Sequence, residues 1–335
     1  MKEIKLAIIG TGKWGINHVR TAYDLLKCDL KLVCDLNKEK ETEVKAISES
    51  IKFDTNLNSA FEDKEINSVI IATPAETHYD LAKKFLVNKK NILVEKPITF
   101  YASQAEELIK LSNQYKKKLM VGHVLLYHPA ITKLKEIICN DVIGKIQYIY
   151  SNRLNLGSVR SEENILWSFA PHDISIVQYL LDNKPINIYA HGASFLQSKI
   201  EDTTLTYLEY PDNIHVHIFV SWLHPFKEHR LVVIGNKGMI VFEDSLLEDK
   251  LKYYPKGFAK INHQLTKFEG KFETINFDNH FPLEEEQKHF FNSIIYDKEP
   301  LTNGYHALEV LKILEEAQKK LLMSDKLHAA EQQWQ

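Results

Sequence analysis

Apolar and polar positions alternate along the first third of the chain in a pattern that predicts strands and helices in turn. Each short apolar run is followed by a longer segment with helical spacing. The predicted strands are Lys5–Gly10, Leu30–Asp35, Ile66–Thr73, Asn91–Glu95 and Leu119–Val124, and the predicted helices are Trp14–Lys27, Asn37–Ser50, Ala75–Lys89 and Tyr101–Lys117. Strands that alternate with helices of this length are typical of a parallel, doubly wound α/β sheet of the Rossmann type with right-handed crossovers.

The pattern changes at about Gly144, where apolar and polar residues begin to alternate one by one. Such alternation predicts an α+β domain with a large, mainly antiparallel sheet. Pro171–Leu181 interrupts it as a helix, and two further helices are predicted at 282–296 and 304–323. We therefore predict a Rossmann domain at 1–121, a second domain at 122–323 for substrate binding and oligomerisation, and a frayed tail at 324–335.

Composition narrows the possible functions. The chain has 335 residues, 44% of them hydrophobic, and a formal net charge of −3, which fits two globular domains and argues against nucleic-acid binding. The apolar runs are too short for a membrane span, so no membrane partner is expected. The N-terminal apolar run leads into a glycine loop instead of a small-residue cleavage site, so we interpret it as a strand and not as a signal peptide. Three cysteines without a CxxC spacing indicate a reducing compartment, and we predict a cytoplasmic protein.

The segment "IIGTGKWG" places Gly10, Gly12 and Gly15 in the spacing G-x-G-x-x-G, directly between a predicted strand and a predicted helix. In that context the glycines allow a tight turn, close approach of a pyrophosphate and close packing of helix on strand. The helix N-terminus offers free N–H groups to phosphates. Asp35 ends the next strand, where a carboxylate binds a ribose 2′-hydroxyl and repels a 2′-phosphate. The motif predicts a dinucleotide site that prefers NAD.

The strand "NILVE" ends in Lys96-Pro97, so an apolar strand carries a lysine at its tip. Together, "GTGKWG", "IATPAETH" and "VEKP" resemble the glucose-fructose oxidoreductase / inositol dehydrogenase (Gfo/Idh/MocA) family. The resemblance extends over nearly the whole chain and includes "GYHALEVLKIL" near its end. It implies an NAD-dependent oxidoreductase acting on CH–OH groups of sugars, with the lysine of E-K-P between nicotinamide and substrate. The Lys-Pro peptide is often cis in that family.

Carried over, the resemblance makes Lys96 the catalytic lysine and Glu95 the residue that orients it or the cofactor. Lys96 stands at the carboxyl end of a strand, where open α/β sheets bind ligands, and partial burial favours its neutral amine as a proton acceptor. The expected cofactor-binding residues are Gly10, Thr11, Gly12, Lys13, Trp14, Gly15, Asp35, Thr73, Pro74, His78, Glu95 and Lys96.

His172 is the second predicted catalytic residue. It follows Pro171, which is favoured at the first position of a helix, and a helix N-terminus disfavours a cation, so we expect a neutral imidazole. The family shows D-x-x-x-H here with the histidine in the proton path. Ser168 occupies the aspartate position, so only the histidine role carries over, and a cleft between the two domains is the expected active site.

A polar segment precedes His172. Arginines bind phosphates bidentately and tryptophan offers a flat face to a sugar or base. This segment and "GHVLLYHPA" resemble the branch of UDP-N-acetylglucosamine 3-dehydrogenases, which implies a nucleotide-sugar substrate and a role in cell-surface glycan biosynthesis such as lipopolysaccharide. The predicted substrate-binding residues are Tyr127, Arg153, Asn155, Arg160, Asn164, Trp167 and His172.

Other assignments stay open at this level. His215 and His217 share one strand face, but without a third ligand we predict no metal. Apolar residues on both faces of Ile214–Leu223 predict a homodimer or homotetramer. Alternative functions are a keto-sugar reductase, an inositol or sugar dehydrogenase of the same family, an NAD-dependent glycosidase, and a non-catalytic sugar sensor.

Overall fold

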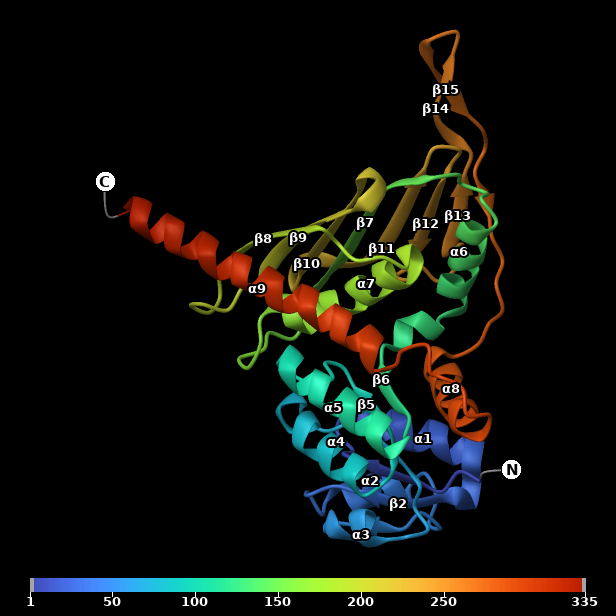
Figure 1. Ribbon diagram of the computed structural model, residues 1–335, viewed down its shortest axis with the longest axis vertical. Coiled ribbons are helices and arrows are strands. Elements are labelled where there is room, and N and C mark those ends of the chain that lie inside the picture. The colour runs from blue at the N-terminus through green and yellow to red at the C-terminus, as the bar shows by residue number, and fades with distance from the viewer. Residues whose placement is uncertain (1–2, 333–335) are drawn as a thin grey trace. The chain divides into compact units, whose positions relative to one another are not determined.

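The structure is a computed structural model that describes residues 3–332, without the side chains of residue 28 and residues 324–332. Two compact units make up the chain: Met1–Tyr127 with His280–Leu311, and His128–Asn279 with Lys312–Gln335 (Figure 1). The predicted boundary assigned 280–311 to the second domain. This segment groups with the first unit because its helix packs on the first helix of the chain and Thr302 pairs with the last strand of the first sheet.

The first unit is built on a six-stranded parallel sheet in the order β3-β2-β1-β4-β5-β6. From the central pair β1–β4 the chain proceeds in opposite directions, so right-handed crossovers place helices on both faces. Burial of β1 and β4 at every position explains their continuous apolar runs. The strands are β1 (Leu6–Ile9), β2 (Leu30–Cys34), β3 (Phe53–Asp54), β4 (Ser68–Ile71), β5 (Asn91–Glu95) and β6 (Leu119–Gly122).

Helices cover this sheet. α4 packs beside α5, and α1 packs against β1, β2 and α8. The helices and helical turns are α1 (Gly15–Leu26), η1 (Lys27–Asp29), α2 (Lys40–Lys45), α3 (Asn58–Glu62), η2 (Ala75–Thr77), α4 (His78–Val87), α5 (Ala102–Tyr115), η3 (Val124–Tyr127), α8 (Pro282–Ile295) and the beginning of α9 (Gly304–Gln332). Thus α8, although late in the sequence, belongs to the Rossmann unit.

The second unit contains an eight-stranded sheet in the order β16-β13-β12-β11-β7-β10-β9-β8. Its pairs are antiparallel except β10–β7, which is parallel, so the predicted mainly antiparallel sheet is confirmed. The strands are β7 (Ile146–Leu156), β8 (Asn187–Ala193), β9 (Thr203–Tyr210), β10 (Ile214–Ser221), β11 (Leu223–Gly235), β12 (Met239–Glu243), β13 (Leu251–Tyr254) and β16 (Glu273–Thr274).

Two helices, α6 (Pro129–Cys139) and α7 (Ile165–Leu181), pack on one face of this sheet, and η4 (Pro211–Asn213) joins β9 to β10. A separate hairpin, β14 (Lys256–Ile261) and β15 (Gln264–Glu269), extends away from the rest of the unit (Figure 1). Among the described residues, we find no helix with the length and apolar character needed to cross a membrane.

The sequence pattern missed several of these elements. It gave no helix at α6, no hairpin at β14–β15 and nothing at β3 and α3. α2 is shorter than predicted, while α9 continues to Gln332, past the predicted end at 323; residues 333–335 lie outside the described part. The α/β class, the sheet types and the order of the remaining elements are confirmed.

Candidate active site

The turn between β1 and α1 has the geometry that its glycines predict. Gly10 has φ +90°, and a Cβ added there would lie 2.7 Å from the carbonyl oxygen of Ala72. A Cβ on Gly15 would collide with the carbonyl oxygen of Gly10, whereas a Cβ on Gly12 would have no atom within 4 Å. The first and third glycines are therefore required by the fold. Gly12 instead borders open space beside the N-terminus of α1, which has no side-chain cap.

Asp35 follows β2 and is held firmly by the glycine turn. Its Oδ2 accepts hydrogen bonds from the backbone N and the Oγ1 of Thr11, both at 2.7 Å, and its Oδ1 accepts one from the Asn37 N at 2.9 Å. Desolvation alone would raise the pKa of this carboxyl, but these hydrogen bonds outweigh it and the pKa lies below its ordinary value. A carboxylate has about four acceptor positions, so one remains for a ligand hydroxyl.

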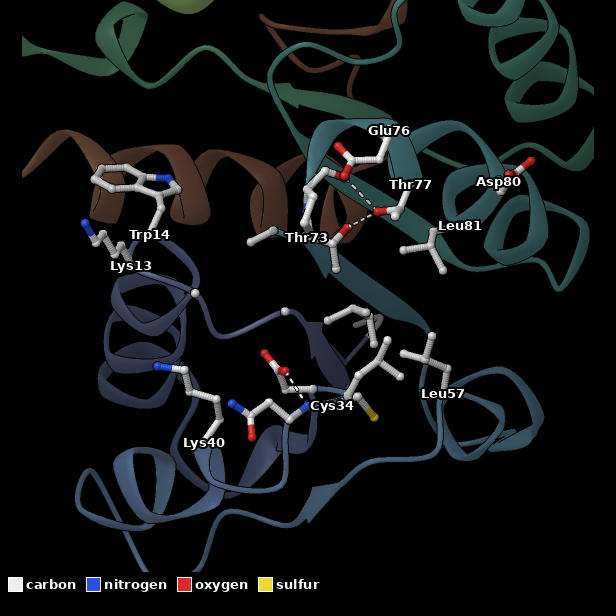
Figure 2. Close-up of a pocket in the computed structure, with 18 residues that line it drawn as sticks. Lys13, Trp14, Cys34, Lys40, Leu57, Thr73, Glu76, Thr77, Asp80 and Leu81 are labelled. Atoms are coloured by element: carbon white, nitrogen blue, oxygen red, sulfur yellow. Dashed lines mark hydrogen bonds between the residues drawn. The ribbon is translucent and has the colours of Figure 1, made fainter. Parts of the chain in front are cut away.

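A cavity of about 760 Å³ opens at the carboxyl ends of β1, β2 and β4. Figure 2 shows Lys13, Trp14 and Lys40 along one side and Leu57 and Leu81 along the other. The apolar side suits a flat ring, and the Lys13 amine near the N-terminus of α1 suits a pyrophosphate. Together with the open space over Gly12, this arrangement fits a dinucleotide.

His78 connects the two remaining motifs of the first unit. It begins α4 and is buried, with Nδ1 2.7 Å from the Pro97 carbonyl oxygen and Nε2 2.9 Å from the Thr73 carbonyl oxygen. Thr73 is also bonded through its hydroxyl to that of Thr77 at 2.7 Å. The segment Thr73-Pro74 and the Lys96-Pro97 turn are thereby fixed to each other at the sheet edge.

Glu95 is the last residue of β5, and its carboxylate accepts several hydrogen bonds. Its Oε1 accepts from Trp14 Nε1 at 2.6 Å and lies 2.7 Å from His18 Nε2, and its Oε2 accepts from the Lys96 backbone N at 3.2 Å. Desolvation would raise the pKa of the Glu95 carboxyl, but these bonds and the Lys96 charge hold it below its ordinary value. Lys96 follows, half-buried, and the Lys96–Pro97 peptide is cis.

His123 lies beside this edge and was not predicted as a site residue. It follows β6, is 3% exposed, and its ring meets that of His306 at 5.4 Å in an edge-to-face contact. Burial lowers the pKa of both rings, that of His306 to about 4, and the Lys96 charge lowers the pKa of His123 further. Both imidazoles are therefore neutral at physiological pH. The only sequence signal was a histidine directly after a parallel strand.

In the second unit His172 lies within α7, half-buried. The prediction that Pro171 begins this helix is wrong: α7 begins at Ile165, because Asn164 caps it by accepting a hydrogen bond from the Trp167 N at 3.3 Å. Since the helix-dipole effect is confined to the first turn, it provides no argument for a neutral His172.

Arg153 is engaged within the second unit. Its Nε and Nη2 donate to the two carboxylate oxygens of Asp173 at 2.7 and 3.0 Å, and both side chains are largely buried. Ser151 Oγ donates to the same carboxylate at 2.7 Å. A bidentate pair of this kind leaves Arg153 few donors for a substrate phosphate.

The other predicted substrate residues have varied environments. Asn164 donates from Nδ2 to Glu201 and, at 2.8 Å, to Gln318, which also accepts from Trp167 Nε1 at 3.0 Å. Arg160 is exposed and pairs with Glu163 at 3.0 Å, and Asn155 has a buried Oδ1 beside Gly157. Tyr127 lies in the first unit, 8% exposed, with its hydroxyl 3.2 Å from that of Thr302.

His215 and His217 each meet a tyrosine rather than each other. The Tyr207 hydroxyl lies 2.7 Å from His215 Nδ1, and the Tyr148 hydroxyl lies 2.6 Å from His217 Nδ1. These partners account for both imidazoles.

A different group, His18, Glu95 and Glu286, has ligand-type atoms within 4.8 Å of one another.

Comparison with known proteins connects this geometry to a family. Residues 4–123 match the oxidoreductase family with an NAD-binding Rossmann fold, GFO/IDH/MocA, and residues 131–241 match the GFO/IDH/MocA C-terminal domain. The chain belongs to the GFO/IDH/MocA family. The resemblance of its three motifs to that family is thereby confirmed, and the protein is an oxidoreductase with an NAD(P)-binding domain.

Relatives within and around the GFO/IDH/MocA family differ in substrate. The chain is 27% identical over 251 residues to the scyllo-inositol 2-dehydrogenase (NAD(+)) of Bacillus subtilis, covering 71% of this chain and 73% of that protein. It is 24% identical over 329 residues to the D-xylose 1-dehydrogenase [NADP(+)] of Haloarcula marismortui, covering 91% and 87%. In fold it resembles the UDP-N-acetylglucosamine 3-dehydrogenase of Acidithiobacillus ferrooxidans, with TM-score 0.82, 20% identity and coverage of 96% and 98%.

Proposed function

We propose that this GFO/IDH/MocA protein is an NAD-dependent dehydrogenase that oxidises the secondary hydroxyl at C3 of a nucleotide-linked N-acetyl-sugar. The proposed substrate is UDP-N-acetylglucosamine or its uronate, and the product is the 3-keto sugar. The observation that carries the dehydrogenase assignment is the placement of the glycine turn and Asp35 around one cavity, with Lys96 directly after the carboxyl end of β5 in the same parallel sheet. The substrate assignment rests on the resemblance of "GHVLLYHPA" and the segment before His172 to that branch.

The proposed reaction breaks the C–H bond at the carbinol carbon and the O–H bond of its hydroxyl. NAD held by the glycine turn and Asp35 would supply the hydride acceptor, and Lys96, in its neutral amine form, takes the hydroxyl proton as the C=O bond forms. His172 is the second proposed proton-transfer group. This role follows the D-x-x-x-H pattern of the family, in which Ser168 here replaces the aspartate. Glu95 fixes the Lys96 backbone through its 3.2 Å hydrogen bond, which makes Glu95 a positioning residue.

We further propose that NAD is preferred over NADP. The remaining acceptor position of Asp35 suits a ribose hydroxyl, and its negative charge opposes a 2′-phosphate. Lys40 borders the same cavity, but it is paired with Glu43 at 2.6 Å, which offsets its charge. Small molecules are the proposed partners, and we place the reaction in the cytoplasm.

An inositol or free-sugar dehydrogenase is the second candidate, favoured by the 27% identity to a scyllo-inositol dehydrogenase. One experiment separates the possibilities: NADH formation by the purified protein with UDP-N-acetylglucosamine, its uronate, dTDP-sugars, myo- and scyllo-inositol and xylose. Turnover confined to nucleotide sugars supports the proposal, and turnover confined to inositols or xylose replaces it. Cleavage of a glycoside without NADH accumulation identifies a glycosidase, and binding without turnover of any substrate identifies a sensor.

A further inference from the structure

Glu286, on the buried face of α8, is an unusual carboxyl group. It is 0% exposed, and neither of its side-chain oxygens has a hydrogen-bond partner among the described residues. Buried polar groups are nearly always hydrogen-bonded, and a buried charge without a partner is very costly. An ionised Glu286 would be such a charge, so its environment requires a neutral acid or a cation that is bound there.

The neighbours of Glu286 show where negative charge resides. One carboxyl oxygen of Glu286, one of Glu95 and one ring nitrogen of His18 lie within 4.8 Å of one another. The Glu95 carboxylate accepts hydrogen bonds from Trp14, His18 and the Lys96 backbone, as described above. Two carboxyl groups that share a site do not both ionise, and the better solvated one keeps the charge. In this pair Glu95 is the anion.

The same three side chains have ligand types that suit a divalent cation, but the hydrogen bonds of His18 argue against one. Gln287 Nε2 lies 3.2 Å from the His18 carbonyl oxygen, which can only accept, so the amide nitrogen faces His18. The same Nε2 donates to His18 Nδ1 at 3.1 Å. His18 Nε2 therefore carries the ring hydrogen and donates to Glu95 at 2.7 Å, an arrangement that leaves no ring nitrogen for a metal.

We propose that Glu286 is a positioning residue held as a neutral carboxylic acid, so that the two neighbouring carboxyl groups hold one proton, on Glu286, and Glu95 stays the single carboxylate anion beside Lys96. α8 thereby contributes to the edge of the sheet where β5 ends, although it is remote in the sequence. The role toward Lys96 rests on the proposed function, whereas the protonation of Glu286 does not depend on it.

The titratable groups on the elements packed around this pair are His18 on α1, Glu95 and Lys96 at the end of β5, and Tyr127 on η3, whose ring lies 5.3 Å from that of His289 on α8. On α8 itself, Glu284 and Glu285 pair with Lys288 at the partly exposed surface. Burial, with the Glu95 charge second, raises the pKa of Glu286 well above its ordinary value. Stability contributed by this proton is full below the unfolded-state pKa of about 4.3 and is lost as pH rises through the folded pKa.

The test uses the full-length protein without cofactor, labelled with ¹³C at the glutamate side-chain carboxyl carbon. We expect one glutamate resonance to report a protonated acid at neutral pH, to be absent from E286Q and to remain in E285Q, the matched control on the same helix. We expect the difference in thermal unfolding midpoint between E286Q and wild type to shift in favour of E286Q as the pH is raised above neutral. E286M provides the same assignment if E286Q does not fold.

Two results would overturn the neutral Glu286: a fully ionised set of glutamates at neutral pH, or one equivalent of zinc or manganese bound by wild type and lost in E286Q. The positioning role has its own readout in the pH profile of kcat/KM with the best substrate found. We expect E286Q to remove one alkaline ionisation from that profile, and an unchanged alkaline limb would overturn the positioning role while leaving the resonance result intact. Absence of turnover in wild type would contradict the proposed function instead.

Discussion

His78 and Pro97 are joined by a hydrogen bond of 2.7 Å from the imidazole Nδ1 to the carbonyl oxygen, while Nε2 faces the Thr73 carbonyl oxygen at 2.9 Å. Carbonyl oxygens only accept, so each of these contacts is a hydrogen bond when the ring nitrogen that faces the oxygen carries a hydrogen. This single side chain links two motifs that are far apart in the sequence, and it fixes the Lys96-Pro97 turn from the side of α4.

H78F keeps a ring of similar size and removes both ring nitrogens. We expect it to lower the free energy of unfolding by about 2 kcal/mol, because two largely buried carbonyl groups lose their partners. Urea denaturation measures this change, and H263F at the exposed tip of the β14–β15 hairpin is the control, with an expected change within about 0.5 kcal/mol. Equal stability of H78F and wild type would contradict the bridging role.

Gly12 and Gly10 should respond differently to alanine. A Cβ on Gly12 meets no atom within 4 Å, so G12A should keep its stability within about 0.5 kcal/mol, yet lose at least about tenfold in NAD affinity because the new methyl group occupies the ligand's space. G10A should lose stability as well, because Gly10 has φ +90° and its Cβ would lie 2.7 Å from the Ala72 oxygen. Calorimetric titration measures the NAD affinity of each variant, and thermal unfolding measures its stability. Full NAD affinity in G12A would exclude this cavity as the dinucleotide site.

Much of the first unit could be predicted because its signals are local. Apolar runs buried on both faces gave β1, β4 and β5, and the glycine spacing gave the β1–α1 turn. The edge strand β3 spans only Phe53–Asp54, too short to produce a pattern. Proline favours the first position of a helix, so the sequence predicts a start at Pro171, but the Asn164 cap determines the start of α7 at Ile165.

The contacts around Glu95 could not be predicted for a different reason. Its partner Trp14 is the N-cap residue of α1 and its partner His18 is on α1, while Glu286 and Gln287 are on α8, nearly 200 residues further along the chain than Glu95. Nothing in the apolar period of α8 distinguishes Glu286 from a surface glutamate, because its burial depends on the packing of α8 against α1. Sequence patterns report local period and chemistry, whereas this cluster is a product of tertiary packing.

Cofactor choice should depend on Asp35. D35S removes the charge and the acceptor positions, and we expect NAD affinity to fall by about tenfold or more, with the NADP to NAD affinity ratio rising. Because Thr11 and Asn37 also lose their acceptor, D35N, which keeps one side-chain oxygen, is the matched variant. Binding of both cofactors to wild type, D35N and D35S measures the effect. Tighter binding of NADP than NAD by wild type would refute the NAD assignment.

The sheet face that carries the Tyr207–His215 and Tyr148–His217 pairs should be a subunit contact. Leu205 on this face is 43% exposed, and apolar groups so placed favour association with a second copy. We expect wild type to be a dimer or tetramer at micromolar concentration and L205R to shift toward monomer in light scattering. L247R, at a side chain 97% exposed elsewhere in the second unit, should leave the assembly unchanged. A strictly monomeric wild type would refute the contact.

Lys96 and His172 should affect turnover more than cofactor binding. The glycine turn and Asp35 supply the proposed cofactor contacts, so K96M should keep NAD affinity within a few-fold while kcat falls by about 10² or more, the scale for loss of a general acid–base group. H172N should reduce kcat by a similar or smaller factor and change its pH dependence, because a histidine in the proton path titrates near neutrality. NAD binding by fluorescence and steady-state turnover separate the two effects. Near wild-type turnover in K96M would refute the mechanism, and loss of NAD binding would instead make Lys96 a cofactor anchor.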